Sequence, residues 1–172
     1  MDPTIFTFSK AAPSDAAAIA ALRVAAAEKL TADFGHGHWS SHATERAVLR
    51  DLAASHVIVA RDDEAIVGTL TLQSKKPWAI DVTHFSVCRK ALYLINMAVE
   101  PGRQRQGIGR RLLAAALVDA RAYPADAIRL DAYEAPAGAG DFYRACGYAP
   151  RGRKVYRGVP LLYFELMTGV AV

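Results

Sequence analysis

The amino-acid sequence predicts an α/β fold in which one sheet contains both parallel and antiparallel strands. A strand over residues 92–99, a long helix and a further strand over 128–133 form a β-α-β unit, which makes its two strands parallel. Hairpins are expected on both sides of this unit, over residues 57–72 and 156–167, and a hairpin joins antiparallel strands. Together these patterns predict a mixed sheet packed against helices.

Length and composition are typical of one globular domain. The chain has 172 residues, of which 52% are hydrophobic and 22% are charged. This balance supplies a hydrophobic core and excludes the disordered and fibrous classes. No internal repeat, low-complexity tract or linker divides the sequence, so we expect a single domain over residues 1–172.

The first half of the chain shows strand and helix signals in turn. Residues 5–8 alternate in polarity, as a strand does. An alanine-rich helix is expected to follow Pro13 and to run through Leu30. Its cap is Ser14 or Asp15. A glycine-bearing loop, a second helix and the two strands of a hairpin complete this half, over residues 33–41, 43–54, 57–60 and 66–72. Three apolar side chains of the second helix are expected to face inward: Val48, Leu49 and Leu52.

The second half contains the β-α-β unit and the closing hairpin. Its expected elements are an irregular segment over 74–90, a strand over 92–99, a long helix that ends near Arg121, a strand over 128–133, a short helix over 141–146 and a hairpin formed by Tyr156 and residues 159–167. Gly147 is expected to end the short helix as a C-cap.

A basic, glycine-bearing turn follows the strand that ends at Val99, and it carries the most informative pattern. Backbone N–H groups at a helix N-terminus lack partners within the helix, and with the helix dipole they bind anions. Gly107 and Gly109 have no Cβ, so a phosphate can approach the backbone closely. Four arginines surround the turn: Arg103, Arg105, Arg110 and Arg111. The segment therefore predicts a site for a phosphate or a pyrophosphate.

The spacing of this turn differs from two common phosphate motifs. The Walker A pattern is absent, and the dinucleotide pattern G-x-G-x-x-G fails because Leu112 stands at its third glycine position. The pattern Gln104-x-x-Gly107-x-Gly109 instead resembles the Q/R-x-x-G-x-G/A signature of the GNAT superfamily of acetyl-CoA-dependent N-acyltransferases. Residues 141–148, DFYRACGY, are similar to the F/L-Y-x-x-x-G-F/Y element of the same family. Both motifs occur in the family's order, and the resemblance covers nearly the full chain.

The resemblance implies a GNAT-like fold, with a central, mostly antiparallel twisted sheet, splayed central strands and helices on both faces. The strands that end at Val99 and near Tyr133 would part at their carboxyl ends, and a bulge near Asn96–Met97 would help the pantetheine arm of acetyl-CoA to enter. The resemblance implies that three residues offer backbone groups to pantetheine: Met97, Ala98 and Val99. It implies that the turn holds the pyrophosphate through seven residues: Gln104, Arg105, Gln106, Gly107, Ile108, Gly109 and Arg110.

One segment departs from the family's pattern. Many relatives place an asparagine on the loop shortly before the tyrosine of the second motif. Residues 136–140 read PAGAG here, so that side-chain contact to the cofactor is not available. We expect backbone groups or water to replace it.

The activity implied is direct transfer of acetyl from acetyl-CoA to a primary amine of a small molecule or a protein. Acyl transfer needs a neutral amine, a donor for the oxyanion and a proton for the departing thiolate. The backbone N–H of Met97 or Ala98 is the expected oxyanion donor. Tyr143 matches the family's tyrosine near the thioester sulfur and is the expected acid. Glu134, just past a strand end, is the first choice for the base. Alternatives to Glu134 are a buried water chain and four residues: Asp81, His84, Asn96 acting through water, and Glu100.

Other classes of function are not indicated by the sequence. The formal net charge of +4 is small enough to be balanced by a polyanionic cofactor. The sequence also has no dense stretch of basic residues interleaved with aromatic ones, so nucleic acid is not an expected partner. No apolar run approaches the length of a membrane span, and nothing marks the chain for export, so we expect a cytoplasmic protein. Cys88 and Cys146 are then expected to be free thiols. The loop histidines His36, His38 and His42 lack the rigid frame of a metal site, so no metal is expected.

Two alternatives to an enzyme remain open. One is a non-catalytic CoA-binding module of the same fold, which would not require Tyr143. The other is a basic protein whose arginine turn binds nucleic acid or phosphorylated partners, for which a steep salt dependence would be the sign. A homodimer also stays open, because the apolar segment 159–164 could serve an interface as easily as a core strand.

Overall fold

The computed structural model describes residues 5–169 of the chain. Its strands are β1 (Phe6–Lys10), β2 (His56–Asp62), β3 (Ala65–Gln73), β4 (Ala91–Val99), β5 (Ala127–Tyr133), β6 (Ala149–Tyr156) and β7 (Val159–Met167). Its α-helices are α1 (Ala16–Phe34), α2 (Glu45–Ala54), α3 (Ile108–Ala122) and α4 (Gly140–Ala145). Short 3-10 turns are η1 (Pro13–Asp15), η2 (Val82–His84) and η3 (Pro101–Arg103).

The strands follow the order β1-β2-β3-β4-β5-β7-β6 in a mixed sheet. The β4–β5 pair is parallel, whereas the pairs β1–β2, β2–β3, β5–β7 and β6–β7 are antiparallel. The mixed sheet predicted from the β-α-β unit and its flanking hairpins is therefore confirmed, and so is the mostly antiparallel arrangement that the family resemblance implied. The chain forms two compact units, one of residues up to Leu72 with Ile95–Ala116, the other of Gln73–Leu94 with the residues from Leu117 onward.

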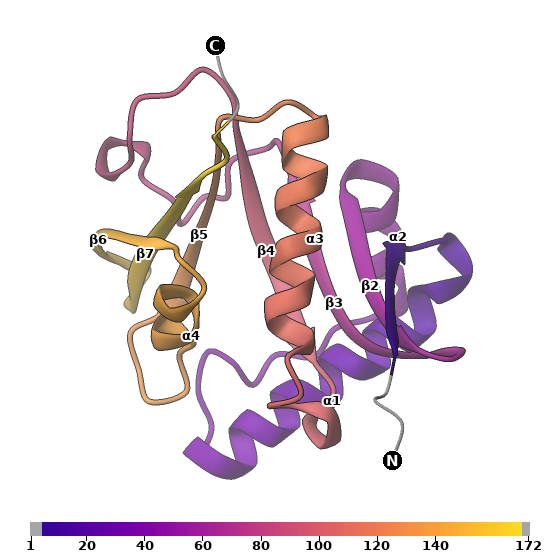
Figure 1. Cartoon of the computed structure of the whole chain (residues 1–172). Helices are drawn as coiled ribbons and strands as arrows, with labels where there is room; N and C mark the ends of the chain where they lie inside the picture. Colours follow the sequence, from indigo (N-terminus) through magenta and orange to yellow (C-terminus); the bar gives the residue numbers. More distant parts are fainter. Residues whose placement is uncertain (1–4, 170–172) are drawn as a thin grey trace. The chain divides into compact units, whose positions relative to one another are not determined.

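The first unit contains the antiparallel strands β1, β2 and β3 together with α1 and α2 (Figure 1). Asp63, with a φ of +49°, forms the turn between β2 and β3, within the hairpin that was predicted over residues 57–72. Small and branched apolar side chains from β2, α1 and α2 fill its core, because they pack closely between a sheet and helices. The buried members of this cluster are Ala11, Ala16, Ile19, Ala20, Val48, Val57 and Val59.

Helix α1 is longer than the sequence predicted. It continues past Leu30 to Phe34, since its alanines favour helix strongly. It ends at Gly35, which has a φ of +80° and donates its backbone N–H to the carbonyl of Thr31 at 2.9 Å. The positive φ explains why glycine ends the helix there.

Helix α2 begins after Thr44, whose hydroxyl accepts the backbone N–H of Ala47 at 3.2 Å. The expected inward position of Leu49 is wrong, because that side chain is 41% exposed while Val48 is fully buried. Val48 and Leu52 lie four residues apart and share one face, whereas a neighbour in sequence turns away from it.

In the second unit, β7 lies between β5 and β6. Tyr163 and Phe164 in β7 are fully buried, so the apolar segment 159–164 forms a core strand. Within the second unit, the β5–β7 ladder runs the full length of β5, and a parallel ladder joins Ala91–Tyr93 of β4 to Ala127–Arg129 of β5. The two strands of the β-α-β unit thus pair at their amino ends.

The sheet of the second unit is covered on both faces. Helix α4 packs against Phe164, whose ring lies 5.9 Å from the ring of Tyr143. The segment between β3 and β4 covers the opposite face, where the ring of Phe85 lies 5.2 Å from the ring of Tyr163. The backbone N–H of Asp81 donates to the Tyr163 hydroxyl at 3.1 Å. Alternate side chains of β5 and β7 therefore face two different environments.

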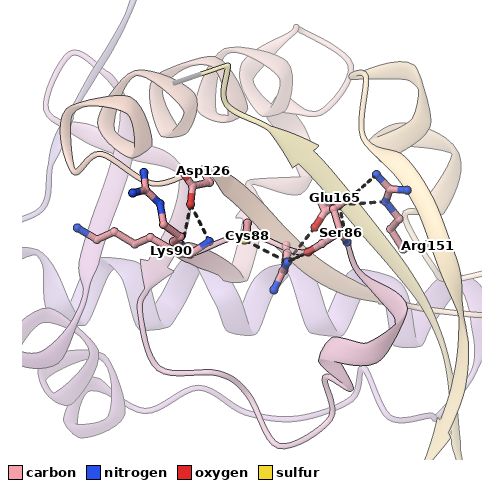
Figure 2. Close-up of polar contacts among 8 residues, drawn as sticks. Ser86, Cys88, Lys90, Asp126, Arg151 and Glu165 are labelled. Carbon is pink, nitrogen blue, oxygen red and sulfur yellow. Dashed lines mark hydrogen bonds and ion pairs between the residues drawn. The ribbon is translucent and has the colours of Figure 1, made fainter. Parts of the chain in front are cut away.

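A buried network of ion pairs and hydrogen bonds holds together the side chains on the face of this sheet that lies opposite α4 (Figure 2). Arg129 Nε donates to Glu165 Oε2 at 2.9 Å, and the two side chains are 6% and 0% exposed. Arg151 Nε donates to the other carboxylate oxygen at 3.0 Å, and the backbone N–H of Ser86 donates to it at 3.3 Å. Burial alone would raise the pKa of Glu165, but hydrogen bonds from Ser86 and Arg129 bring it below its ordinary value. Arg129 also contacts Cys88 Sγ at 3.2 Å, so the network joins β5, β6 and β7 to the segment before β4.

Candidate active site

The basic turn adopts the geometry of an anion site at the start of α3. Arg105 and Gly107 have φ values of +61° and +80°. The backbone N–H of Arg111 donates to the carbonyl of Gly107 at 3.1 Å, which makes Gly107 the cap of the helix. The N–H groups of the three residues that follow a cap have no acceptor within the helix. The first turn of α3, residues 108–110, therefore presents backbone donors and the positive end of the helix dipole.

The arginines around this turn divide into two pairs. Arg103 forms an ion pair with Asp62 in the first unit. Arg111 donates to the carbonyl of Phe6 at 3.2 Å, and its guanidinium also lies over a neighbouring aromatic ring. Arg105 and Arg110 are exposed. Two of the four predicted charges thus hold the turn onto β1 and β2, and two face solvent.

The carboxyl end of β4 contains a left-handed residue where the bulge was predicted. Asn96 has a φ of +54° and donates its side-chain N–H to Asp51 at 3.2 Å. The same oxygen of Asp51 accepts from Arg23 at 3.0 Å, and Arg23 also donates to the hydroxyl of Thr71 at 3.2 Å. The side chains of α1, α2 and β3 thereby anchor the residue before Met97. Sequence reasoning missed Asp51, because an acid on a helix is usually a surface group.

Tyr143 lies in α4 with only 7% of its surface exposed. Its ring contacts those of Phe142, Tyr148 and Phe164, at centroid distances of 5.4, 5.8 and 5.9 Å. Burial, followed by the nearby charge of Asp131, raises the pKa of Tyr143 well above its ordinary value. The phenol therefore keeps its proton throughout the neutral range.

Helix α4 ends as the sequence predicted. Gly147 has a φ of +89°, and its N–H donates to the carbonyl of Arg144 at 3.0 Å. The backbone N–H of Tyr148 donates to the carbonyl of Tyr143 at 3.0 Å, which joins the two tyrosines of the motif. The hydroxyl of Tyr148 is buried and, among residues 5–169, has no hydrogen-bond partner. Cys146 in this turn and Cys88 are free thiols, as predicted.

The predicted base candidates are held by cations or rings. Glu134 accepts from Arg153 Nε at 3.0 Å and forms a second bond to the same guanidinium. Asp81 pairs with Lys154 at 2.9 Å, and hydrogen bonds from Thr83 and that lysine keep the pKa of its carboxyl well below the usual range. Three candidates remain: Glu100 is 4.0 Å from Arg103, the ring of His84 lies 5.3 Å from that of Tyr163, and Asn96 donates to Asp51 at 3.2 Å.

Asp131 is an acid of β5 that sequence reasoning did not select. Burial raises the pKa of its carboxyl above the ordinary value, while its own backbone N–H opposes that rise. Its negative charge in turn raises the pKa of Tyr133, Tyr143 and Tyr163, after burial in each case. The available signal was a charged residue at the centre of a strand whose neighbours in sequence are apolar.

Two of the loop histidines line a hollow in the first unit. The hollow has a volume of about 350 Å³ and lies between α1 and the following loop, lined by Ala27, Glu28, Thr31, Ala32, His36, Ser40 and His42. Over residues 5–169, no group of three or more His, Cys, Asp or Glu side chains is placed to hold a metal ion. Over the same residues, no helix is both long and apolar enough to cross a membrane.

The sequence profile described as the acetyltransferase (GNAT) family matches residues 22–148, which include the turn before α3 and Tyr143. The chain belongs to this family. The match covers the larger part of the chain and confirms the family that its two motifs predicted. No protein of the curated set matches it.

Solved structures share the GNAT fold over nearly the whole chain. A Salmonella typhimurium protein, the putative acetyltransferase yncA with its cofactor acetyl-CoA, is 18% identical and superposes with a TM-score of 0.69 over 95% of this chain and 94% of that one. The ribosomal-protein-S18-alanine N-acetyltransferase of Escherichia coli is 16% identical, with a TM-score of 0.73 over 98% and 97%. A GCN5-related N-acetyltransferase from Rhodopseudomonas palustris is 22% identical, with a TM-score of 0.71 over 97% and 98%.

Proposed function

We propose that this GNAT-family protein transfers acetyl from acetyl-CoA directly to a primary amine of a small molecule or a protein. The observation that carries the proposal is the N-terminus of α3, capped by left-handed Gly107 within the segment that matches the family. A structural neighbour, the Salmonella protein, is described with acetyl-CoA as its cofactor.

The residues of the turn fit a pyrophosphate. The first turn of α3 offers backbone donors, and exposed Arg105 and Arg110 add positive charge. In this proposal the pyrophosphate lies against residues 104–110, and the pantetheine arm bonds to the backbone of Met97, Ala98 and Val99.

The reaction proceeds without a covalent enzyme intermediate. The amine nitrogen attacks the thioester carbon, and the backbone N–H of Met97 or Ala98 stabilises the oxyanion. The tetrahedral intermediate collapses with cleavage of the C–S bond, and Tyr143 gives its proton to the thiolate. Glu134 is the base proposed from the sequence, and its carboxylate accepts two hydrogen bonds from the Arg153 guanidinium.

A thiol-release assay with acetyl-CoA and an amine panel tests the proposal. The panel should contain small primary amines, amino-sugar amines and peptides with free N-termini. Release of CoA that depends on one amine, with intersecting initial-rate patterns, is the expected result. CoA binding by calorimetry without thiol release from any amine would instead indicate a non-catalytic binding module.

A further inference from the structure

We propose that Asp131, and not a residue past the end of β5, removes the proton from the acceptor amine. The inference rests on the proposed function and names the base of that same reaction. Three observations in the second unit carry it: the position of Asp131 along β5, the face of the sheet that it occupies, and the absence of a cationic partner for its carboxylate.

The register of β5 against β7 places Asp131 opposite the acid. Asp131 pairs with Tyr163, and Leu130 pairs with Phe164. Directly paired residues point to the same face, so Leu130 lies on the face that α4 and Tyr143 cover. Asp131 consequently points to the other face, beside Tyr163. Tyr143 thus approaches β5 from one side of the sheet and Asp131 lies on the other.

This arrangement suits acyl transfer. The attacking amine and the departing thiolate occupy different positions on the tetrahedral carbon, so the groups that exchange protons with them must stand apart. An acid on one face of β5 and a base on the opposite face keep these two groups apart.

The partners of the nearby acids separate Asp131 from its rivals. Glu134, Asp81 and Glu165 accept hydrogen bonds from Arg153, Lys154 and Arg129 respectively. Within residues 5–169, the carboxylate of Asp131 contacts no lysine, arginine or histidine, and only its own backbone N–H bonds to it. A half-buried carboxylate without a cation accepts a proton more readily than one that is ion-paired.

The proton balance of the step is complete. As the amine nitrogen bonds to the thioester carbon it becomes positively charged, and its N–H proton passes to a carboxylate oxygen of Asp131. The C–S electron pair leaves with sulfur, which takes the Tyr143 proton. Asp131 then returns its proton to solvent, and Tyr143 regains one. The net reaction converts acetyl-CoA and a neutral amine into an amide and CoA thiol, with no net change in the number of protons.

The environment of Asp131 keeps its carboxyl protonated to a higher pH than usual, and this fits a base that works near neutrality. The titratable groups on the same face of the sheet are Tyr133 and Arg129 of β5 and Tyr163 and Glu165 of β7, and Arg129 and Glu165 pair with one another at 2.9 Å. Asp81 contacts the Tyr163 hydroxyl, the ring of His84 lies 5.3 Å from that of Tyr163, and Lys154 pairs with Asp81. The tyrosines stay neutral, because burial raises the pKa of Tyr133, Tyr143 and Tyr163. Asp81 and Lys154 neutralise one another at 2.9 Å. The variant Asp131→Asn tests whether the acidic limb of the rate profile belongs to this carboxyl.

The test is Asp131→Asn, which keeps the shape of the side chain. We expect kcat to fall by about 100-fold or more, with CoA affinity by calorimetry within a few-fold of wild type. The acidic limb of the kcat/KM profile should disappear, and Asp131→Glu should restore part of the rate. Asp141→Asn is the matched control, because that carboxylate is fully exposed on α4 and pairs only with Arg144.

Two results overturn the assignment. One is an Asp131→Asn protein with wild-type kcat and an unchanged acidic limb. The other is a Glu134→Gln protein that loses the limb while Asp131→Asn keeps it. Failure of the proposed function is a separate result, since the wild-type protein itself would then release no thiol with any amine.

Discussion

Gly107 shows how one residue sets the backbone at the anion site. Its φ of +80° is a conformation that L side chains adopt at a cost of about 1–2 kcal/mol. A Cβ added there would meet no atom within 4 Å, so the cost is conformational and not steric. The cap that starts α3 therefore depends on the absence of a side chain, and the donors that follow it depend on the cap.

Gly107→Ala should weaken CoA binding by about 1 kcal/mol or more, which is a factor of about five. Calorimetric titration of the folded variant measures this directly. Gly102→Ala is the matched control, because a Cβ at Gly102 also meets no atom within 4 Å but its φ is not in the left-handed range. Equal CoA affinity of Gly107→Ala and wild type would remove the pyrophosphate assignment.

Tyr143 in α4 and Tyr148, which follows the end of that helix, differ in the proposed role of their hydroxyl groups. Tyr143→Phe keeps the buried ring and deletes the proton donor, so kcat should fall by about 10- to 100-fold while acetyl-CoA binding stays within a few-fold. Tyr148→Phe removes a hydroxyl that has no partner among residues 5–169 and should leave kcat unchanged. Single-turnover kinetics of both variants provide the comparison. A wild-type chemical rate in Tyr143→Phe would reduce that residue to packing.

At the scale of elements, the carboxyl end of β4 is held by side chains from α1, α2 and β3. A non-glycine residue with positive φ inside a strand persists only where its surroundings fix it. Asp51 supplies the fixing contact to Asn96 at 3.2 Å, and Arg23 supplies the countercharge. The contact between Asp51 and Asn96 therefore orients the backbone groups of the residues that follow, which are proposed to bind pantetheine.

Substitutions at Asn96 separate its backbone from its side chain. Asn96→Ala should destabilise the fold by about 1 kcal/mol more than Asn96→Gly, because glycine adopts the φ of +54° without strain. Urea denaturation of both variants gives the difference. If the two variants unfold at the same urea concentration, β4 does not depend on the left-handed residue.

At the scale of the whole molecule, the sequence predicted what local patterns determine. Period-two and helical spacing gave the order of strands and helices, and the glycine spacing gave the turn before α3. The features that the sequence did not predict depend on tertiary contacts. Leu49 faces solvent because Val48 takes the core position, and Arg103 serves the turn by pairing with distant Asp62. Asp131 was not selected from the sequence, because only the pairing of β5 with β7 shows which face of the sheet it occupies.

The buried network of Glu165 gives the molecule a pH-dependent stability. Hydrogen bonds outweigh burial and hold the pKa of Glu165 below its ordinary value of 4.5, so the folded state binds fewer protons there than the unfolded state. This contribution is complete above the ordinary pKa of 4.5 and is lost as the pH falls below it. The raised pKa of Asp131 acts in the opposite sense, since ionisation of that carboxyl disfavours the folded state.

Glu165→Gln should remove the dependence that Glu165 creates. The change leaves Arg129 buried without its countercharge, and breaking such a pair typically costs about 3–5 kcal/mol. Denaturation curves between about pH 3 and about pH 7 should show a large loss in the variant at neutral pH and a smaller difference from wild type in acid. Glu64→Gln, at an exposed turn position, is the matched control. A Glu165→Gln protein that is as stable as wild type at neutral pH would show that Ser86 and Cys88 suffice to hold Arg129 in place.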